Sequence, residues 1–455
     1  MIRNKTIISL MIFLILILNI GFSSTIIAEK TLKNNDFLQK NEIINQNIIE
    51  AINKVNKSNV TKYLKELVNI GPRYTGSKNC KKAAKYIYEK LKDIGLYTYI
   101  QKWNYIRNRG ENVIAVINGT DLSSDKVIII FSHYDTITFP SLFPENHSQG
   151  ANCGGSGIAI LLAAAEVFSQ YSFNHTIKFI AFSGEHVGCY GSLDYARKAY
   201  FKNENIYCAI MLDALGEANS LIDGKLVKIS FQDRSTFLYN FTKDLCKRYK
   251  EHIDLDVRFN LDLPCNHYSF YKYGFDAIKF EQYASMENVD SPDDTIDKIN
   301  FSYLTKMTKF ITALGFELGL KPIDLQVRII TPLEDYIYFM GFPILKLPNF
   351  NFERTNYDGA TIIFGSCKVK VNITSSDEIE KIVYSIDGLL HSANRENKTT
   401  WKIHGFLSPI IGKHKIRVYV FTKTGKIAFD EMDAYFLIFR FIYPIINPFW
   451  QKWAK

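Results

Sequence analysis

The chain has 455 residues, 47% of them hydrophobic, which is enough for one large core and a second domain, because single cores usually stop growing near about 250–300 residues. Its 55 Lys and Arg residues outnumber 46 Asp and Glu residues, and they are scattered without a basic run or a repeated arginine–aromatic pattern. This distribution argues against nucleic-acid binding. Seven cysteines, widely spaced and odd in number, imply no disulfide scaffold and leave at least one thiol free, intermolecular or on a metal.

The N-terminal segment, residues 1–30, has the pattern of an export signal. Arg3 and Lys5 precede an apolar stretch over residues 7–20, and this charge arrangement disfavours a buried helix of a cytosolic protein. We therefore expect a secreted or cell-surface protein, with the segment either cleaved as a signal peptide or kept as a membrane anchor. Sequons such as Asn118 and Asn240 suit such a protein, although an Asn-rich chain produces many by chance.

An α/β domain is expected over residues 59–322, after a spacer with helical tendency over residues 31–58. Short apolar, β-branched runs predict buried strands, and helical spacing of apolar residues between and around them predicts helices. The predicted strands are 126–131, 176–182 and 208–212, and the predicted helices are 79–91, 157–168, 193–200 and 301–318. Alternation of strand and helix predicts a mostly parallel central sheet flanked by helices.

Beyond Pro322 the pattern changes to alternating strands with turn signals, which predicts an all-β sandwich over residues 323–440. The expected strands and turns are 368–373, 381–386, 415–421, Asp387-Gly388 and Thr424-Gly425. The stretch IEKIVYSIDG…W…GKHKIRVYVFTKTGK resembles the immunoglobulin-like modules that are often appended to exported enzymes. Residues 441–455 form an aromatic tail in which Arg440, Pro444 and Pro448 argue against a membrane span, so a sandwich edge or an interfacial contact is expected.

Each of the three predicted strands of the α/β domain is followed by side chains that could bind a metal. His133 with Asp135 follows the first strand, Glu185 with His186 the second, and Asp213 the third. Taken alone, His-x-Asp is more often a hydrogen-bonded structural histidine, and a Glu-His pair in a loop is normally solvated. Ligand sites of open α/β sheets, however, gather at the carboxyl ends of strands, so the three endings together predict one site.

Five segments resemble, in order, the motifs of the co-catalytic zinc aminopeptidases, metallopeptidase family twenty-eight, which includes relatives of glutamate carboxypeptidase and glutaminyl cyclase. The resemblance extends from Gly71-Pro72-Arg73 to Leu318. The segments are FSHYDT, GANCGGSGIAILLAAAEVF, IKFIAFSGEHVGCYGS, AIMLDALGE and VDSPDDTIDKI.

The resemblance implies roles for residues that match the family pattern. His133 and Asp213 would bind one zinc ion, Asp135 would orient His133, and Glu185 would be the general base. Three positions depart from the pattern: Cys153 stands where a bridging Asp is usual, His186 where a Glu is usual, and Asp290 where a His is usual.

Two of these departures compensate each other, because His186 and Asp290 still offer one imidazole and one carboxylate. Cys153 as a thiolate would be a good zinc ligand, although it donates more charge than a carboxylate. The alternatives for Cys153 are a small apolar residue under the Gly-rich turn, or a disulfide with Cys189. By the same resemblance, His267 shapes the pocket.

The expected function is that of an exported exopeptidase of the aminopeptidase type, with one or two zinc ions and a peptide or small-protein substrate. Glu185 would take a proton from the attacking water. Two alternatives stay open: an inactive binding protein that keeps the fold, motivated by the three altered ligands, and a single-zinc acyltransferase like the glutaminyl cyclases, whose pattern requires carboxylates at Cys153 and His186.

Overall fold

The structure is a computed structural model that describes residues 44–438 with gaps. The gaps are 106–107, 123, 139–146, 203, 233–234, 262, 321–324, 334–335, 348–360, 376, 388, 393–398 and 404–409. The expected export signal and the aromatic tail lie outside the described residues. Within the described ranges, none of the helices combines the length and the apolar character that a membrane span requires.

The α/β domain is built on an eight-stranded sheet with the order β1-β2-β4-β3-β5-β8-β6-β7. Its centre, from β4 through β3 and β5 to β8, is parallel. The strands are β1 (Tyr97–Tyr105), β2 (Asn108–Ile117), β3 (Lys126–His133), β4 (Thr176–Phe182), β5 (Asn205–Leu212), β6 (Leu226–Ser230), β7 (Asp256–Phe259) and β8 (Ala277–Gln282). The parallel centre confirms the expected fold class and places the carboxyl ends of β3, β4 and β5 at one edge.

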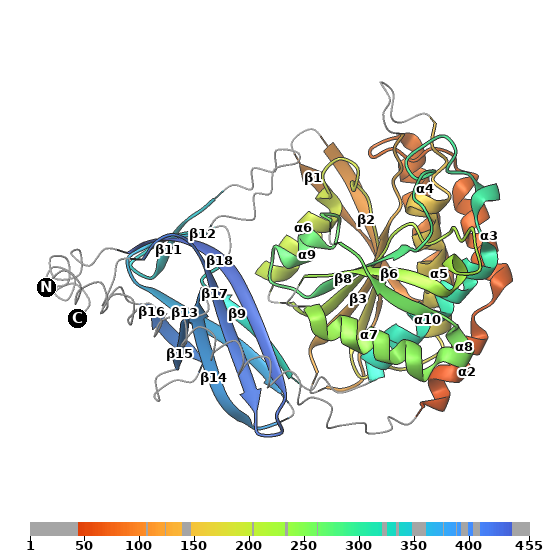
Figure 1. Cartoon of the computed structure of the whole chain (residues 1–455). Coiled ribbons are helices and arrows are strands. Elements are labelled where there is room, and N and C mark those ends of the chain that lie inside the picture. The colour runs from red at the N-terminus through yellow and green to blue at the C-terminus, as the bar shows by residue number, and fades with distance from the viewer. Residues whose placement is uncertain are drawn as a thin grey trace, which may run out of the picture. The chain divides into compact units, whose positions relative to one another are not determined.

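Helices cover both faces of this sheet (Figure 1). Helices α5 (Gly157–Phe168) and α10 (Phe301–Leu320) pack on one face with α2, α3, α4 and α7, whereas α6 (Tyr190–Phe201) and α9 (Tyr268–Tyr271) pack on the other. The remaining helices are α2 (Gln46–Lys54), α3 (Lys57–Val68), α4 (Lys78–Asp93), α7 (Thr236–Arg248) and α8 (Lys250–Ile253).

The two faces follow from the alternation of side chains along each strand. In β3, Ile128 and Ile130 belong to the core under α5 and α10, whereas Ile129 and Phe131 belong to the core under α6. Each central strand is therefore apolar on both sides, as a parallel sheet covered on both faces requires. The continuous apolar runs that predicted these strands are the direct result.

Two features of the domain differ from the sequence-based expectation. β1 and β2 form an antiparallel hairpin at one side of the sheet, and β6 runs antiparallel to β8 at the other, so the sheet is mixed. The expected spacer also contributes to the domain, because α2 buries Ile48 and Ile52 in its core. The boundary expected at residue 59 therefore lies too late.

Residues 325–438, as far as they are described, form two β-sheets. One is seven-stranded with the order β11-β10-β12-β18-β17-β14-β15, and the other is three-stranded with the order β16-β13-β9. The strands are β9 (Leu325–Thr331), β10 (Tyr336–Phe339), β11 (Phe342–Lys346), β12 (Thr361–Phe364), β13 (Cys367–Ser375), β14 (Ile379–Ile386), β15 (Leu389–Ser392), β16 (Thr400–Ile403), β17 (Ile410–Thr422) and β18 (Ile427–Ile438). A shared core from both sheets is consistent with a β-sandwich; the immunoglobulin-like resemblance stays a prediction.

Candidate metal centre

The side chains that follow β3, β4 and β5 converge at the carboxyl edge of the parallel strands. His133 is the last residue of β3, Glu185 lies three residues after β4, and Asp213 directly follows β5. One ligand atom from each of these three lies within 4.8 Å of the others. Each strand ending alone is a weak indication of a metal site, but the three sets of side chains meet in space.

His133 is at the centre of this cluster and is fully buried. Its Nδ1 lies 3.1 Å from the backbone carbonyl oxygen of Asp135, which can only accept, so the proton belongs on Nδ1. Nε2 is then left with a lone pair, and it lies 3.4 Å from Glu185 Oε2 and 3.5 Å from Asp213 Oδ1. A histidine held in this tautomer is prepared to bind a metal through Nε2.

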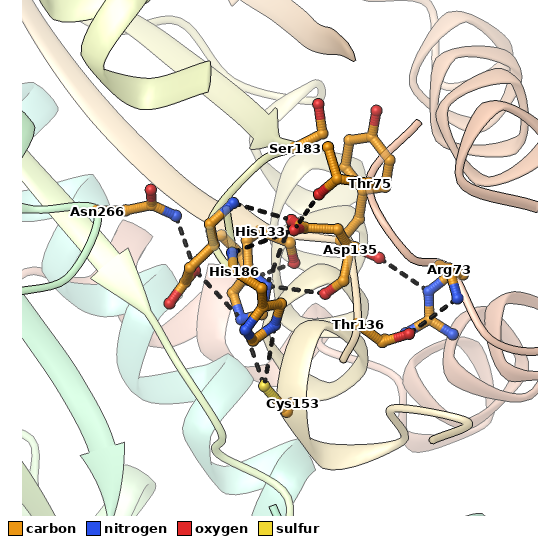
Figure 2. A network of polar contacts seen from close by, with 12 residues as sticks. Arg73, Thr75, His133, Asp135, Thr136, Cys153, Ser183, His186 and Asn266 are labelled. Atoms are coloured by element: carbon orange, nitrogen blue, oxygen red, sulfur yellow. Dashed lines mark hydrogen bonds and ion pairs between the residues drawn. The ribbon is translucent and has the colours of Figure 1, made fainter. Parts of the chain in front are cut away.

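Asp135 is also fully buried, but its carboxylate serves more partners than the sequence suggested. Its Oδ1 is 3.8 Å from His133 Nδ1, farther than its own backbone oxygen. The carboxylate instead accepts a hydrogen bond from Thr75 Oγ1 at 2.7 Å and longer ones, at 3.4 Å, from the backbone N–H groups of Glu185 and His186 (Figure 2). Asp135 thus holds the loop after β4 against the end of β3.

Cys153 and His186 complete the other side of the cluster. Cys153 Sγ lies 3.7 Å from His133 Nε2 and 3.9 Å from His186 Nε2, between the two imidazoles (Figure 2). All three ligand atoms lie within 4.8 Å of one another. Cys153 and Cys189 are both free thiols, so the structure does not contain the disulfide considered for them.

Asp290 lies beside His186, with its Oδ1 3.9 Å from His186 Nε2. That oxygen is buried and has no hydrogen-bond partner among the described residues. A buried carboxylate oxygen without a donor is costly, and a cation shared with His186 would supply the missing partner. The structure thus brings together all seven residues predicted for the site, although Asp290 belongs to neither of the two tight groups.

Two residues that the sequence did not single out hold Glu185. Cys265 Sγ donates to Glu185 Oε1 at 2.8 Å, and Asn266 Nδ2 donates to Glu185 Oε2 at 2.7 Å. Ser192 Oγ lies 2.7 Å from Asn266 Oδ1, which fixes the amide so that its nitrogen faces Glu185. The only sequence signal for this pair was its place beside His267, which is buried and makes edge-to-face contacts with Tyr268 and Tyr271.

The backbone around Cys153 is shaped by a glycine and a buried carboxylate. Gly154 has a φ of +70°, and a Cβ there would lie 2.7 Å from the backbone oxygen of Asp135, so a side chain cannot be accommodated. Asp294 accepts hydrogen bonds from the backbone N–H groups of Asn152 and Cys153 at 2.6 and 3.0 Å. These contacts turn Cys153 toward His133.

Arg73 ties together two of the loops that carry the site. It is fully buried, and burial lowers the pKa of its guanidinium to about 10. Nε donates to the backbone oxygen of Tyr134 at 2.8 Å, while the two terminal nitrogens donate to those of Gln149 and Gly150 at 2.7 and 2.8 Å. The resemblance began at this residue, and the structure gives it a positioning role.

The electrostatics of the cluster favour a cation. Burial raises the pKa of Glu185 to about 7. Burial would also raise the pKa of Asp213, but the contact with His133 and the positive charge of Lys279 together outweigh it and hold that pKa at about 2. Burial alone would lower the pKa of His133, yet the neighbouring carboxylates of Glu185, Asp135 and Asp213 raise it well above its usual value. Negative groups therefore surround one imidazole in a desolvated site.

The spacing of the ligand atoms fits a zinc ion. Nitrogen and oxygen ligands bind zinc at about 2.0–2.1 Å and sulfur at about 2.3 Å, so tetrahedral neighbours lie about 3.4 to 3.6 Å apart. The distances from His133 Nε2 to Asp213 Oδ1 and to Cys153 Sγ are 3.5 and 3.7 Å. Imidazole, thiolate and carboxylate are also the ligand types that zinc takes.

The parallel sheet and the cluster of zinc-type ligands at its carboxyl edge together place the α/β domain in the class of metallopeptidases. More particularly, residues 112–315 match the model of peptidase family M28. A probable aminopeptidase of Saccharomyces cerevisiae is 24% identical over 300 residues, covering 61% of this chain and 77% of the relative. The LapA aminopeptidase structure of Legionella pneumophila superposes with a TM-score of 0.54 at 18% identity, covering 62% of this chain and 76% of that one.

Other relatives match over a shorter part of their length. A probable zinc metalloprotease of Pyrenophora teres f. teres is 23% identical over 204 residues, which is 40% of this chain and 43% of that protein. The chain thus spans less than half the length of this curated relative.

Proposed function

We propose that the chain is a zinc-dependent aminopeptidase that is exported from the cell. The observation that carries the proposal is the position of His133 Nε2, which lies 3.4 to 3.7 Å from ligand atoms of Glu185, Asp213 and Cys153. The family match of residues 112–315 and the relatives named as aminopeptidases support the reaction class. The charge pattern of residues 1–30 supports export.

The metal would be held by two overlapping sets of side chains. His133 and Asp213 would hold one zinc ion, Cys153 would bridge, and His186 with Asp290 would hold a second. Zinc bound there would supply Lewis acidity, which polarises a peptide carbonyl and lowers the pKa of water. Asp135 would keep His133 and the loop of His186 in place through its buried hydrogen bonds.

Glu185 would move the proton. A carboxylate held beside the metal-binding side chains can accept a proton from water and return it to a leaving group. Cys265 and Asn266 direct the carboxylate by donating to its two oxygens. Glu185 would accept the proton of the attacking water at Oε2, which faces His133, and deliver it to the nitrogen of the leaving amine.

The proposal is tested by replacing Glu185. We expect Glu185→Gln to keep the zinc content measured by atomic absorption but to lower turnover of an aminoacyl chromogenic substrate by at least about a thousandfold, since general-base catalysis contributes up to about 10⁴-fold. Glu89→Gln, an exposed Glu of α4, is the matched control and should keep full activity. Unchanged turnover in Glu185→Gln would refute the assigned role.

The wild-type protein separates the alternatives. An absence of bound zinc and of hydrolysis would favour the non-catalytic binding protein, motivated by the three altered ligand positions. Cyclisation of an N-terminal glutamine peptide without aminopeptidase turnover would favour the glutaminyl cyclase type. Export is tested separately by sequencing the N-terminus of protein recovered from the culture medium or the membrane.

A further inference from the structure

One end of the seven-stranded sheet carries two rows of apolar side chains on a single face. In the first row, Phe342 pairs with Phe339, Phe339 with Phe364, Phe364 with Leu437, and Leu437 with Ile411. In the second row, Leu345 pairs with Ile337, Ile337 with Ile362, and Ile362 with Tyr435. Directly paired residues of neighbouring strands point to the same face. We call these nine side chains the outer apolar face.

This face is the one turned away from the core of the sandwich. Tyr338, Ile363 and Phe436, which alternate with the two rows along their strands, are buried in that core. Several members of the outer apolar face are instead exposed to solvent: Phe342 (74%), Leu345 (56%), Ile411 (52%), Phe339 (44%) and Tyr435 (43%). Contiguous exposed apolar side chains of this kind mark an interaction surface.

The size of the face does not suit a second copy of the chain. Five strands spaced about 4.8 Å apart span about 19 Å, and two rows on one face lie about 7 Å apart. Nine side chains at this spacing cover about 300 Å² of the sheet, whereas a stable protein–protein interface takes about 800 Å² from each partner. The face is broad along one direction and shallow along the other.

Farther along the same strands, the outward side chains are charged and paired. Lys413 lies 3.0 Å from Asp433, and Lys415 lies 2.8 Å from Glu431. The apolar rows therefore occupy only the tip of the sheet and give way to a hydrated flank within one further row. A depth of about 7 Å matches the about 5–10 Å by which interfacial elements bury apolar groups at a membrane surface.

The chain also leaves the sheet at this tip. β18 ends at Ile438, directly after Leu437 of the first row. The sequence that follows, FRFIYPIINPFWQKWAK, combines Phe, Tyr and Trp with Arg and Lys and has no acidic residue. Aromatic and basic side chains together are typical of segments at the boundary between water and lipid.

We propose that the outer apolar face docks on a lipid membrane surface, with its phenylalanines at the level of the headgroups and upper acyl chains. The sandwich would thereby hold the protein at a membrane independently of its N-terminal segment. This inference does not depend on the peptidase activity.

The experiment places a tryptophan in the face of the full chain. Phe342→Trp is bound to vesicles of phosphatidylcholine and phosphatidylglycerol whose acyl chains carry bromine, and its fluorescence is compared with that of the wild type. Phe259→Trp, at a phenylalanine of β7 in the α/β domain that is 61% exposed, is the control. We expect the tryptophan at 342 to lose at least about half of its emission, because bromine reaches groups at that depth, and the tryptophan at 259 to lose none.

Three outcomes would overturn the proposal. The full chain could fail to bind the vesicles, or the tryptophan at 342 could stay unquenched on vesicle-bound protein, which would leave binding to the N-terminal segment alone. Alternatively, the emission of Phe342→Trp could be shifted to short wavelength before lipid is added. A shift that depends on protein concentration would identify self-association, and one that does not would identify coverage by another segment of the chain.

Discussion

The two halves of the candidate metal centre differ in burial and in how they relate to the family pattern. His133 and Asp135 match the pattern with fully buried side chains, and Glu185 and Asp213 match it with side chains 11% exposed. The side chains of His186 and Asp290, which depart from it, are 10% and 34% exposed. The matching half is fixed by strand ends and backbone hydrogen bonds; the altered half lies in loops. The halves are thus distinguished by anchoring at strand ends more than by burial, since the altered Cys153 is buried too, and the type of donor has been kept at His186 and Asp290.

This difference predicts that the two halves contribute unequally. The buried half has little freedom to replace a missing ligand, because its neighbours are held by the sheet. The exposed half is nearer to water, which can take the place of a lost ligand. Mutations that compare the halves should therefore show the largest effects around His133.

His133→Ala is expected to have the largest effect. It removes the one side chain common to both groups of ligand atoms, so we expect loss of bound zinc and a fall in turnover of at least about 10³-fold, the order seen when a preorganised electrostatic element is removed. His186→Ala should lose no more than one zinc equivalent and keep measurable turnover. Zinc content and kcat measured on both variants check this order; equal losses would show that the halves are not distinct.

Asp135→Asn should have the next largest effect. The amide has nearly the same shape, but its nitrogen cannot accept hydrogen bonds from Thr75 or from the backbone of Glu185 and His186. Loss of an outer partner of this kind typically lowers metal affinity by about 10–100-fold. Competition with a chelator measures the affinity, and Thr75→Val, which removes one of these bonds, should fall between Asp135→Asn and the wild type.

Cys153→Asp examines the bridging position directly. A carboxylate donates less charge than a thiolate, so we expect zinc to be retained and kcat to rise a few-fold because the metal stays a stronger Lewis acid. Cys153→Ala should lower the zinc content instead. If Cys153→Ala retains the full zinc content and the wild-type kcat, Cys153 is a packing residue and not a ligand.

Much of the fold was predictable because its strands are apolar on both sides. The run at residues 176–182 has the bounds of β4, and the helix predicted over 157–168 has those of α5. β6, β7 and the hairpin of β1 and β2 were not predicted, because their sequences mix polar and apolar residues at the sides of the sheet. Helix α2 was missed as part of the core, because its apolar stripe is narrow among Asn and Lys residues.

The candidate site was predictable where a metal-binding side chain directly follows a strand. It was not predictable where a hydrogen bond joins loops that are distant in sequence. His133, Glu185 and Asp213 could be grouped because parallel strands end at one edge. The hydrogen bond from Cys265 to Glu185 joins residues that are 80 apart in sequence, and no local pattern indicates it. Asp294 likewise reaches the backbone of Cys153 from a loop 141 residues away.

The smallest effect that still tests this account concerns Cys265, whose thiol donates to Glu185 Oε1. Cys265→Ser keeps a donor, whereas Cys265→Ala leaves that oxygen without it. Because a thiol is a weak donor, the alanine variant should lose only about twofold to fivefold in kcat, the order of a hydrogen bond of about 0.5–1 kcal/mol. The serine variant should recover most of that loss, and KM and zinc content should stay unchanged in both. Cys246→Ala, at a buried thiol of α7, controls for the loss of packing. A purely structural role of Cys265 would lower kcat equally in Cys265→Ser and Cys265→Ala. The difference in kcat between these two variants therefore decides whether the thiol positions the general base.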